Sequence, residues 1–99
     1  MDDWIEMTAD PRSVAKEREK ARELRKSSWW KEQLAKGVCY YCGGHFQPAE
    51  LTMDHIVPVA RGGRSTRGNV VCACKPCNAS KRYLTPVEQI MRDLEQNDR

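Results

Sequence analysis

Helical spacing of hydrophobic residues is clearest at the two ends of the chain. Asp10 followed by proline is an N-cap and first-turn signal, and neither proline nor glycine interrupts residues 12–36. A serine pair that begins at Ser27 marks a break in this run. After the break, a second short helix is expected to carry Trp29 and Trp30 into the core.

Weaker patterns in the middle of the chain predict two short strands. Residues 51–59 alternate weakly between apolar and polar, and they predict a strand that ends at Pro58. Residues 61–69 hold three glycines with serine and threonine, which is typical of a loop. A second strand at 70–71 is expected to return the chain to Cys72.

Two helices are predicted after this strand. The first covers 78–84, and the second begins at Thr85, where a following proline and Glu88 complete a capping box. Apolar residues lie on one face of the last helix, so we expect them to be core or an oligomer contact rather than a site. They are Val87, Ile90, Met91 and Leu94.

Length and composition indicate one small domain with a thin core. The chain has 99 residues, of which 39% are hydrophobic, so a cross-link should matter for stability. We divide it into an N-terminal helical arm (1–37), a core (38–84) and a C-terminal helix (85–99). No apolar run approaches the roughly 20 residues that span a bilayer, so no membrane partner is expected. Reduced cysteines and the lack of a signal peptide favour an intracellular, cytoplasmic location.

The cysteines form two C-x-x-C pairs, Cys39 with Cys42 and Cys74 with Cys77. Two such turns complete the tetrahedral sulfur shell of a structural zinc ion. Two disulfides or a redox motif are the alternatives, but the odd number of cysteines argues against them. The fifth thiol, Cys72, could compete as a ligand in a C-x-C arrangement. We expect it instead to be a small buried residue of the preceding strand, because the spacing of Cys74 and Cys77 repeats that of the first pair.

Zinc would dominate the stability of so small a domain. Its apparent binding free energy in small domains is about 10–16 kcal/mol, comparable to or larger than the stability of an ordinary domain. The metal-free protein is therefore expected to be largely unfolded. Residues 38–46 are predicted to form the first knuckle hairpin, and His45 within it is expected at the surface or as a hydrogen-bond donor to sulfur.

Charge is informative through its distribution rather than its total. The formal net charge of +3 falls to about +1 once four thiolates and one zinc ion are counted. From His55 to Val87, however, there is no acidic residue, which favours a phosphate-facing surface over a merely solvated loop. The basic residues of that stretch are Arg61, Arg64, Arg67, Lys75, Lys81 and Arg82. In 12–36 the basic residues alternate with glutamates, which permits a DNA-flanking role but is more typical of an exposed helix face with i,i+4 pairs.

Four strings together resemble the HNH endonucleases, over about residues 38–82. They are Leu-Thr-Met-Asp-His-Ile-Val-Pro at 51–58, Arg-Gly-Gly at 61–63, Gly-Asn at 68–69 and Cys-Lys-Pro-Cys-Asn at 74–78. The resemblance implies an α+β fold, with a small ββα-metal core stapled by a four-cysteine zinc site and flanked by N- and C-terminal helices. The roles of those flanking helices do not follow from it.

The resemblance also implies the roles of the site residues. Asp54 and the amide oxygen of Asn78 would bind one Mg²⁺ or Mn²⁺, which prefer hard oxygen ligands. His55 would be the general base, largely neutral near its ordinary pKa of about 6.5. Similar proteins end the motif with histidine at the position of Asn78. Asparagine at this position corresponds to the H-N-N variant of the family. Asn69 would tie the loop and position the catalytic strand, on which Asp54 and His55 point to opposite faces unless the strand is distorted.

We therefore expect an endonuclease that hydrolyses phosphodiester bonds of DNA, most readily double-stranded, with one divalent ion. One such site cuts one strand, so nicking is the natural activity of a monomer, and a homodimer or paired nicks would be needed for a double-strand break. By resemblance the products carry 5′-phosphate and 3′-hydroxyl ends. The alternative is a non-catalytic zinc-knuckle module that binds nucleic acid, which leaves Asp54, His55 and Asn78 unexplained. A third hypothesis is an adaptor that binds a partner protein through Trp29, Trp30 and the last helix.

Overall fold

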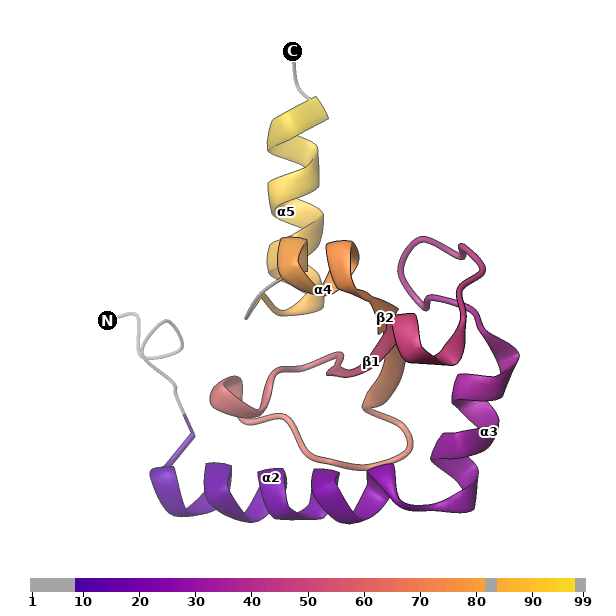
Figure 1. The fold of residues 1–99 in the computed structure, drawn as a ribbon. Helices are drawn as coiled ribbons and strands as arrows, with labels where there is room; N and C mark the ends of the chain where they lie inside the picture. The colour runs from indigo at the N-terminus through magenta and orange to yellow at the C-terminus, as the bar shows by residue number, and fades with distance from the viewer. Residues whose placement is uncertain (1–8, 82–83, 98–99) are drawn as a thin grey trace.

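The computed structural model describes residues 9–81 and 84–97 and has the predicted α+β fold, with helices around a two-stranded sheet (Figure 1). Its elements are α2 (Pro11–Arg25), α3 (Ser28–Lys36), η1 (Pro48–Glu50), β1 (Leu51–His55), η2 (Val59–Arg61), β2 (Val70–Cys74), α4 (Lys75–Lys81) and α5 (Pro86–Asn97). Within the described residues, no helix combines the length and the apolar character needed to cross a membrane.

The N-terminal helices begin and end at the predicted residues. The Asp10 side chain accepts from the N–H of Arg12, and the Ser27 side chain accepts from the N–H of Trp30 at 3.2 Å, which caps α3. Gly37 ends α3 in the left-handed conformation, with φ of 67°. Ion pairs on α2 join glutamates to basic residues three positions later, rather than four as expected. They are Glu17–Lys20, Glu19–Arg22 and Glu23–Lys26.

β1 and β2 pair antiparallel, from Leu51 opposite Cys74 to His55 opposite Val70. The prediction that the first strand runs to Pro58 is wrong, because β1 ends at His55. Beyond it, the backbone of residues 56 and 57 turns to Asn69 instead of to a neighbouring strand. The N–H of Ile56 donates to the backbone carbonyl of Asn69. The Asn69 side chain accepts from the N–H of Val57 through Oδ1 and donates to the carbonyl of Val57 through Nδ2.

α4 (Lys75–Lys81) begins three residues before its predicted start, and residues 82–83 of the predicted helix lie outside the described residues. The second knuckle is therefore the first turn of this helix rather than a loop before it. Pro76 does not prevent this, because a first-turn residue needs no intrahelical N–H bond. β2 runs directly into α4, so Cys74 and Cys77 are held by a strand end and a helix start.

The core is small and lies where the sheet meets α2, α3 and the knuckles. Among the described residues it is built from Ala21, Trp30, Cys39, Leu51, Met53, Val70, Cys72, Ala73 and Cys74. Trp30 is 3% exposed, as expected, and Trp29 packs against the cluster while remaining partly exposed. Only short segments of sheet and helix contribute, which agrees with the thin core predicted from composition.

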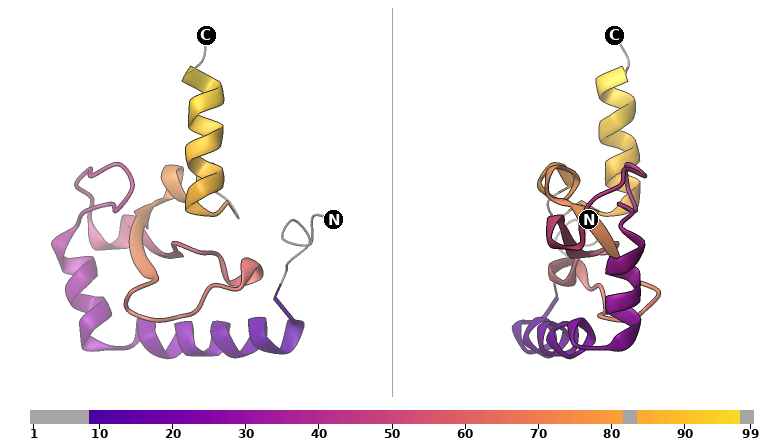
Figure 2. Two further views of the ribbon diagram at one scale, coloured as in Figure 1. Left: turned by 180° about the vertical axis from the view of Figure 1, so that it is seen from behind. Right: turned by 45° about the vertical axis from the view of Figure 1, so that its right-hand side comes forward.

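α5 projects away from the rest of the molecule (Figure 2). Its predicted capping box is present, with the N–H of Thr85 donating to Glu88 Oε1 at 2.9 Å. Of the two predicted roles of its apolar face, the role in the core is wrong, because that face is open to solvent, and the oligomer contact stays a prediction. Exposed fractions on it are 66% for Val87, 60% for Ile90, 59% for Met91 and 64% for Leu94.

Candidate active site

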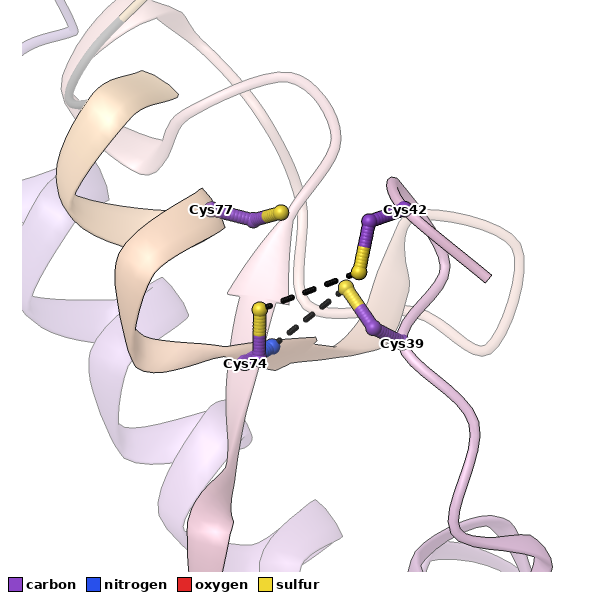
Figure 3. A group of neighbouring side chains, drawn as sticks. All are labelled: Cys39, Cys42, Cys74 and Cys77. Carbon is purple, nitrogen blue, oxygen red and sulfur yellow. Dashed lines mark hydrogen bonds between the residues drawn. The ribbon is translucent and has the colours of Figure 1, made fainter. Parts of the chain in front are cut away.

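Four cysteine sulfurs converge at the junction of the first knuckle with the start of α4 (Figure 3). The Sγ atoms of Cys39, Cys42, Cys74 and Cys77 all lie within 4.8 Å of one another. A tetrahedral shell with metal–sulfur bonds of about 2.3 Å places its sulfurs about 3.8 Å apart. The four cysteines are thus arranged to bind a metal ion.

Backbone N–H groups of the knuckles point at this sulfur cluster. The N–H of Cys74 approaches Cys39 Sγ at 3.4 Å, and the N–H of Gly44 approaches Cys42 Sγ at 3.4 Å. Burial raises the pKa of Cys39, but the N–H groups of Cys42, Cys74 and Tyr41 outweigh it and lower this pKa to about 6. A thiolate is therefore favoured at the position where a cation would neutralise it.

Cys72 and His45, which the sequence analysis considered near the cysteine pairs, are not part of this cluster. Cys72 is 6% exposed within β2, which confirms its predicted place as a small buried residue of the strand. Burial also raises the pKa of its thiol, as expected for a group that holds no metal. His45 is exposed in the first knuckle, where its backbone forms an isolated antiparallel bridge with Val38.

Asp54 is 8% exposed on β1, and its carboxylate is fixed by two partners. Tyr41 donates its phenol hydrogen to Oδ2, and Lys81 Nζ lies 3.1 Å from the same oxygen. Burial first, and then the bond to Asp54, raise the pKa of Tyr41, so the phenol keeps the hydrogen that it donates. Asp54 thus presents an oriented carboxylate beside a fixed ammonium.

Lys81 does not lie where a phosphate-binding residue would. It is 2% exposed, it pairs with Asp54, and its Nζ also donates to the carbonyl of His55. Its predicted place on the DNA-facing surface is therefore wrong. An ammonium that is buried and bonded in this way holds the end of β1, and it would have to leave both partners to reach a phosphate.

His55 is held by a chain of hydrogen bonds that leads to α2. Its Nε2 lies 2.9 Å from the Ser65 hydroxyl, and that hydroxyl donates its single hydrogen to the carbonyl of Glu17 at 2.6 Å. Ser65 must therefore accept from Nε2–H, which leaves Nδ1 of the neutral ring as the acceptor. The Glu17 carboxylate also accepts from the N–H of Ser65 at 2.7 Å.

The electrostatics around His55 favour the neutral ring. Burial lowers its pKa, and Arg25 and Lys81 lower it further, while Asp54 and Glu17 oppose them. The net direction is below the ordinary pKa of about 6.5. A neutral imidazole at physiological pH is the form that accepts a proton.

A cleft of about 420 Å³ brings the predicted metal-binding and base residues together. Asp54 and His55 line it from the end of β1, and Asn78 lines it from the first half of α4. Asp54 and His55 both line this cleft, although they are neighbours on β1, where strict alternation would point them to opposite faces. The other lining residues are Arg18, Ala21, Arg22, Arg25, Pro58, Val59 and Ala60.

Asn69 lies outside this cleft and supports its wall. Its amide bonds both polar groups of Val57, at 2.9 and 3.0 Å, and its Nδ2 also donates to the carbonyl of Arg64 at 2.8 Å. One side chain therefore ties the loop after η2 to the segment that leaves His55.

The remaining predicted DNA-contact residues have different surroundings. Arg61 pairs with Glu88 at 2.9 Å, and Arg67 lies over the ring of Trp29 with 5.4 Å to its centroid. Arg64 and Lys75 are exposed. Arg82 lies outside the described residues.

Sequence reasoning missed several residues of the site. Tyr41 and Ser65 carry no motif signal, because their importance comes from contacts with residues 13 and 10 positions away. The arginines at 18, 22 and 25 did carry a signal, since their spacing of four and three places them on one helix face. Their alternation with glutamates suggested an ordinary solvated surface instead.

Comparison with known proteins places residues 39–93 in a family described as HNH endonuclease. The chain is 48% identical over 44 residues to the CRISPR-associated endonuclease Cas9 of Corynebacterium diphtheriae, a match that covers 43% of the chain and 4% of that protein. It is 46% identical over 45 residues to Cas9 of Actinomyces naeslundii, covering 44% of the chain and 4% of the relative.

A third relative is the type IV methyl-directed restriction enzyme EcoKMcrA of Escherichia coli. The identity is 27% over 71 residues, which covers 66% of the chain and 26% of that enzyme. The chain thus spans only a small part of the length of each of these curated relatives.

Proposed function

Because the chain belongs to the HNH endonuclease family, we propose that it hydrolyses phosphodiester bonds of DNA. In this proposal His55 is the general base, and Asp54 and Asn78 hold one divalent cation. The observation that carries it is the single cleft lined by these three side chains. A carboxylate, a neutral imidazole and an amide that converge on one cleft are the groups that metal-assisted hydrolysis needs.

The residues around His55 suit the first chemical step. Ser65 holds Nε2–H, so Nδ1 is the atom that accepts the proton of the attacking water. The lowered pKa of His55 keeps that atom unprotonated at physiological pH. Asn69 fixes the backbone that follows His55 and so keeps the ring from moving with the loop.

The donor sets fit two different metal ions. Four cysteine sulfurs suit a structural zinc ion, whereas the carboxylate of Asp54 and the amide oxygen of Asn78 suit Mg²⁺ or Mn²⁺. When bound, the hard cation would stabilise the charge that develops on the phosphate and the leaving oxygen. Tyr41 and Lys81 orient the Asp54 carboxylate for this task.

One site of this kind cuts one strand, so the proposed activity of a monomer is nicking. The products would carry 5′-phosphate and 3′-hydroxyl ends. A double-strand break would need a homodimer or two nicks close together.

The test is cleavage of supercoiled plasmid by zinc-loaded protein, with and without added Mg²⁺ or Mn²⁺. We expect conversion to open circles that depends on the added cation. The His55→Ala protein should lose at least about a hundredfold in rate, which is the lower range for removal of a general base. A gel shift with the same variant should show DNA binding retained.

His45→Ala is the matched control, because it also removes one imidazole from the same domain. His45 is exposed in the first knuckle and does not line the cleft, so cleavage should stay at the wild-type rate. Intact plasmid in every lane, with DNA still retarded on the gel, would reject the nuclease and support the non-catalytic binding module.

A further inference from the structure

Three arginines of α2 face the cleft that holds Asp54, His55 and Asn78. Arg18, Arg22 and Arg25 are spaced by four and three residues, so they lie on one face of the helix. All three are exposed, and all three line the cleft. Seven residues of helix extend about 10 Å, which matches about three base steps at 3.4 Å per step.

The acidic residues of α2 point elsewhere. Glu17 turns to the backbone of Ser65, and Glu19 and Glu23 line a separate hollow on another side of the helix. Arg22 pairs with Glu19 at 2.8 Å, but these side chains are 64% and 59% exposed, so the pair is weak and readily exchanged. The glutamates of α2 thus lie away from the cleft, on sides of the helix that also carry Lys16 and Lys20, whereas the charged residues of α2 that line the cleft are all arginines.

Among the residues that the structure describes, the cleft is lined by a single acidic side chain. That residue is Asp54, which already pairs with the buried Lys81. Within the described part of the chain, three exposed guanidinium groups therefore face a wall whose one negative charge is already paired. Such a surface attracts a polyanion, and arginine binds phosphate with paired, fixed N–H groups.

The position of α2 is fixed rather than left to a loose arm. Ala21, on the same face as the arginines, is 2% exposed and belongs to the core. The Ser65 hydroxyl donates to the carbonyl of Glu17, and the Ser65 N–H donates to its carboxylate. These two hydrogen bonds hold α2 against the loop between β1 and β2 (Figure 1). The arginines are therefore held at the cleft before any ligand binds.

We propose that Arg18, Arg22 and Arg25 bind phosphates of the DNA strand that enters the cleft, so that α2 forms the second wall of the DNA-binding surface. The inference rests on the proposed function, because it takes DNA as the ligand of the same cleft. It extends that function to a helix that lies before the family match at 39–93.

The test measures binding of a fluorescent DNA duplex by zinc-loaded protein over a series of KCl concentrations, without added Mg²⁺. The triple variant Arg18→Gln, Arg22→Gln, Arg25→Gln should bind about tenfold or more weakly at moderate salt. Its plot of log affinity against log salt should lose about 2 to 3 units of slope, since each phosphate contact contributes about 0.9.

The matched control removes the same charge from exposed residues that do not line the cleft. The variant Arg12→Gln, Lys26→Gln, Lys31→Gln should keep most of the slope. The variant Arg18→Lys, Arg22→Lys, Arg25→Lys should also keep most of the slope, because its charge is unchanged. Zinc content and circular dichroism should be equal in all of them.

The outcomes separate this inference from the proposed function. If the glutamine variant at 18, 22 and 25 retains its zinc and binds with the slope of the matched control, the α2 surface is rejected. If the slopes differ as expected but the wild type does not cut plasmid, the nuclease is rejected and the DNA-binding surface stands. If the lysine variant loses the slope as well, a charge-based phosphate contact is rejected.

Discussion

At the scale of single residues, hydrogen bonds and an ion pair from neighbouring side chains fix the orientation of Asp54 and His55 in the cleft. Tyr41 and Lys81 both bond the same oxygen of Asp54. Ser65 sets the tautomer of His55, because its hydroxyl donates to the carbonyl of Glu17 and can only accept from the imidazole. Each of these partners comes from a different element, so the geometry exists only in the folded domain. Orientation of this kind is what lets a base or a metal ligand act without further rearrangement.

Lys81 offers the sharpest test at this scale. Replacement by methionine keeps the volume but leaves the buried Asp54 carboxylate without its ammonium. Removal of one partner of a buried pair costs about 3 kcal/mol or more, so Lys81→Met should lower the free energy of unfolding by about that amount. Thermal unfolding of the zinc-loaded protein measures this, and the salt dependence of DNA binding should stay unchanged.

Lys75→Met is the control, since Lys75 is exposed at the start of the same helix. Its unfolding free energy should change by no more than about 0.5 kcal/mol, while the salt slope falls by about 1 if it contacts a phosphate. The opposite pattern, with a stable Lys81→Met protein that loses salt slope, would return Lys81 to the DNA-facing surface.

At the scale of elements, the connection between β1 and β2 decides where His55 ends up. The side-chain amide of Asn69 forms hydrogen bonds with both the N–H and the carbonyl of Val57, so β1 ends one residue after Asp54 and the chain turns. The sequence predicted both strands and the loop, but not this end point. Apolar residues continue past His55, and only a long-range side-chain bond shows that they leave the sheet.

Gly63 makes the same connection possible by its lack of a side chain. A Cβ at this position would lie 1.7 Å from the carbonyl oxygen of Val57 and 2.6 Å from its carbon, both of them backbone atoms that cannot move cheaply. Gly63→Ala should therefore destabilise the protein by about 2 kcal/mol or more and reduce cleavage, because the turn after His55 must shift. Chemical denaturation and plasmid nicking measure the two effects.

Gly68→Ala is the matched control in the same loop. No heavy atom lies within 4 Å of a Cβ built there, so stability should be unchanged or slightly raised by the loss of chain entropy in the unfolded state. Equal stability of the two variants would show that the close approach at Gly63 does not constrain the loop.

At the scale of the whole molecule, the parts that local patterns describe were predicted best. The helix caps at Asp10 and Thr85, the break at Ser27 and the cysteine spacing depend on neighbours in sequence, and the structure confirms them. The sequence left the apolar face of α5 open between core and oligomer contact, and it did not predict the burial of Lys81, because burial depends on what else packs nearby. Helical spacing cannot say whether a face meets a core or solvent.

The sulfur cluster is the feature on which all these parts depend, because it joins the first knuckle to both β2 and α4. Removal of zinc should therefore unfold the domain as a whole. Cys77→Ala should lose zinc and most of its helical circular dichroism, since the metal supplies about 10–16 kcal/mol and the core is too small to replace it.

Cys72→Ala is the matched control, because it removes a thiol from the same sheet but outside the cluster. It should keep one zinc ion per chain and unfold at a slightly lower temperature, as expected for the loss of a small buried side chain. If instead Cys72→Ala lost the metal and Cys77→Ala kept it, the C-x-C pair would hold the ion. If Cys77→Ala lost its zinc and stayed folded, the packing of α2 and α3 on the sheet would be sufficient by itself, and the metal would not be the main source of stability.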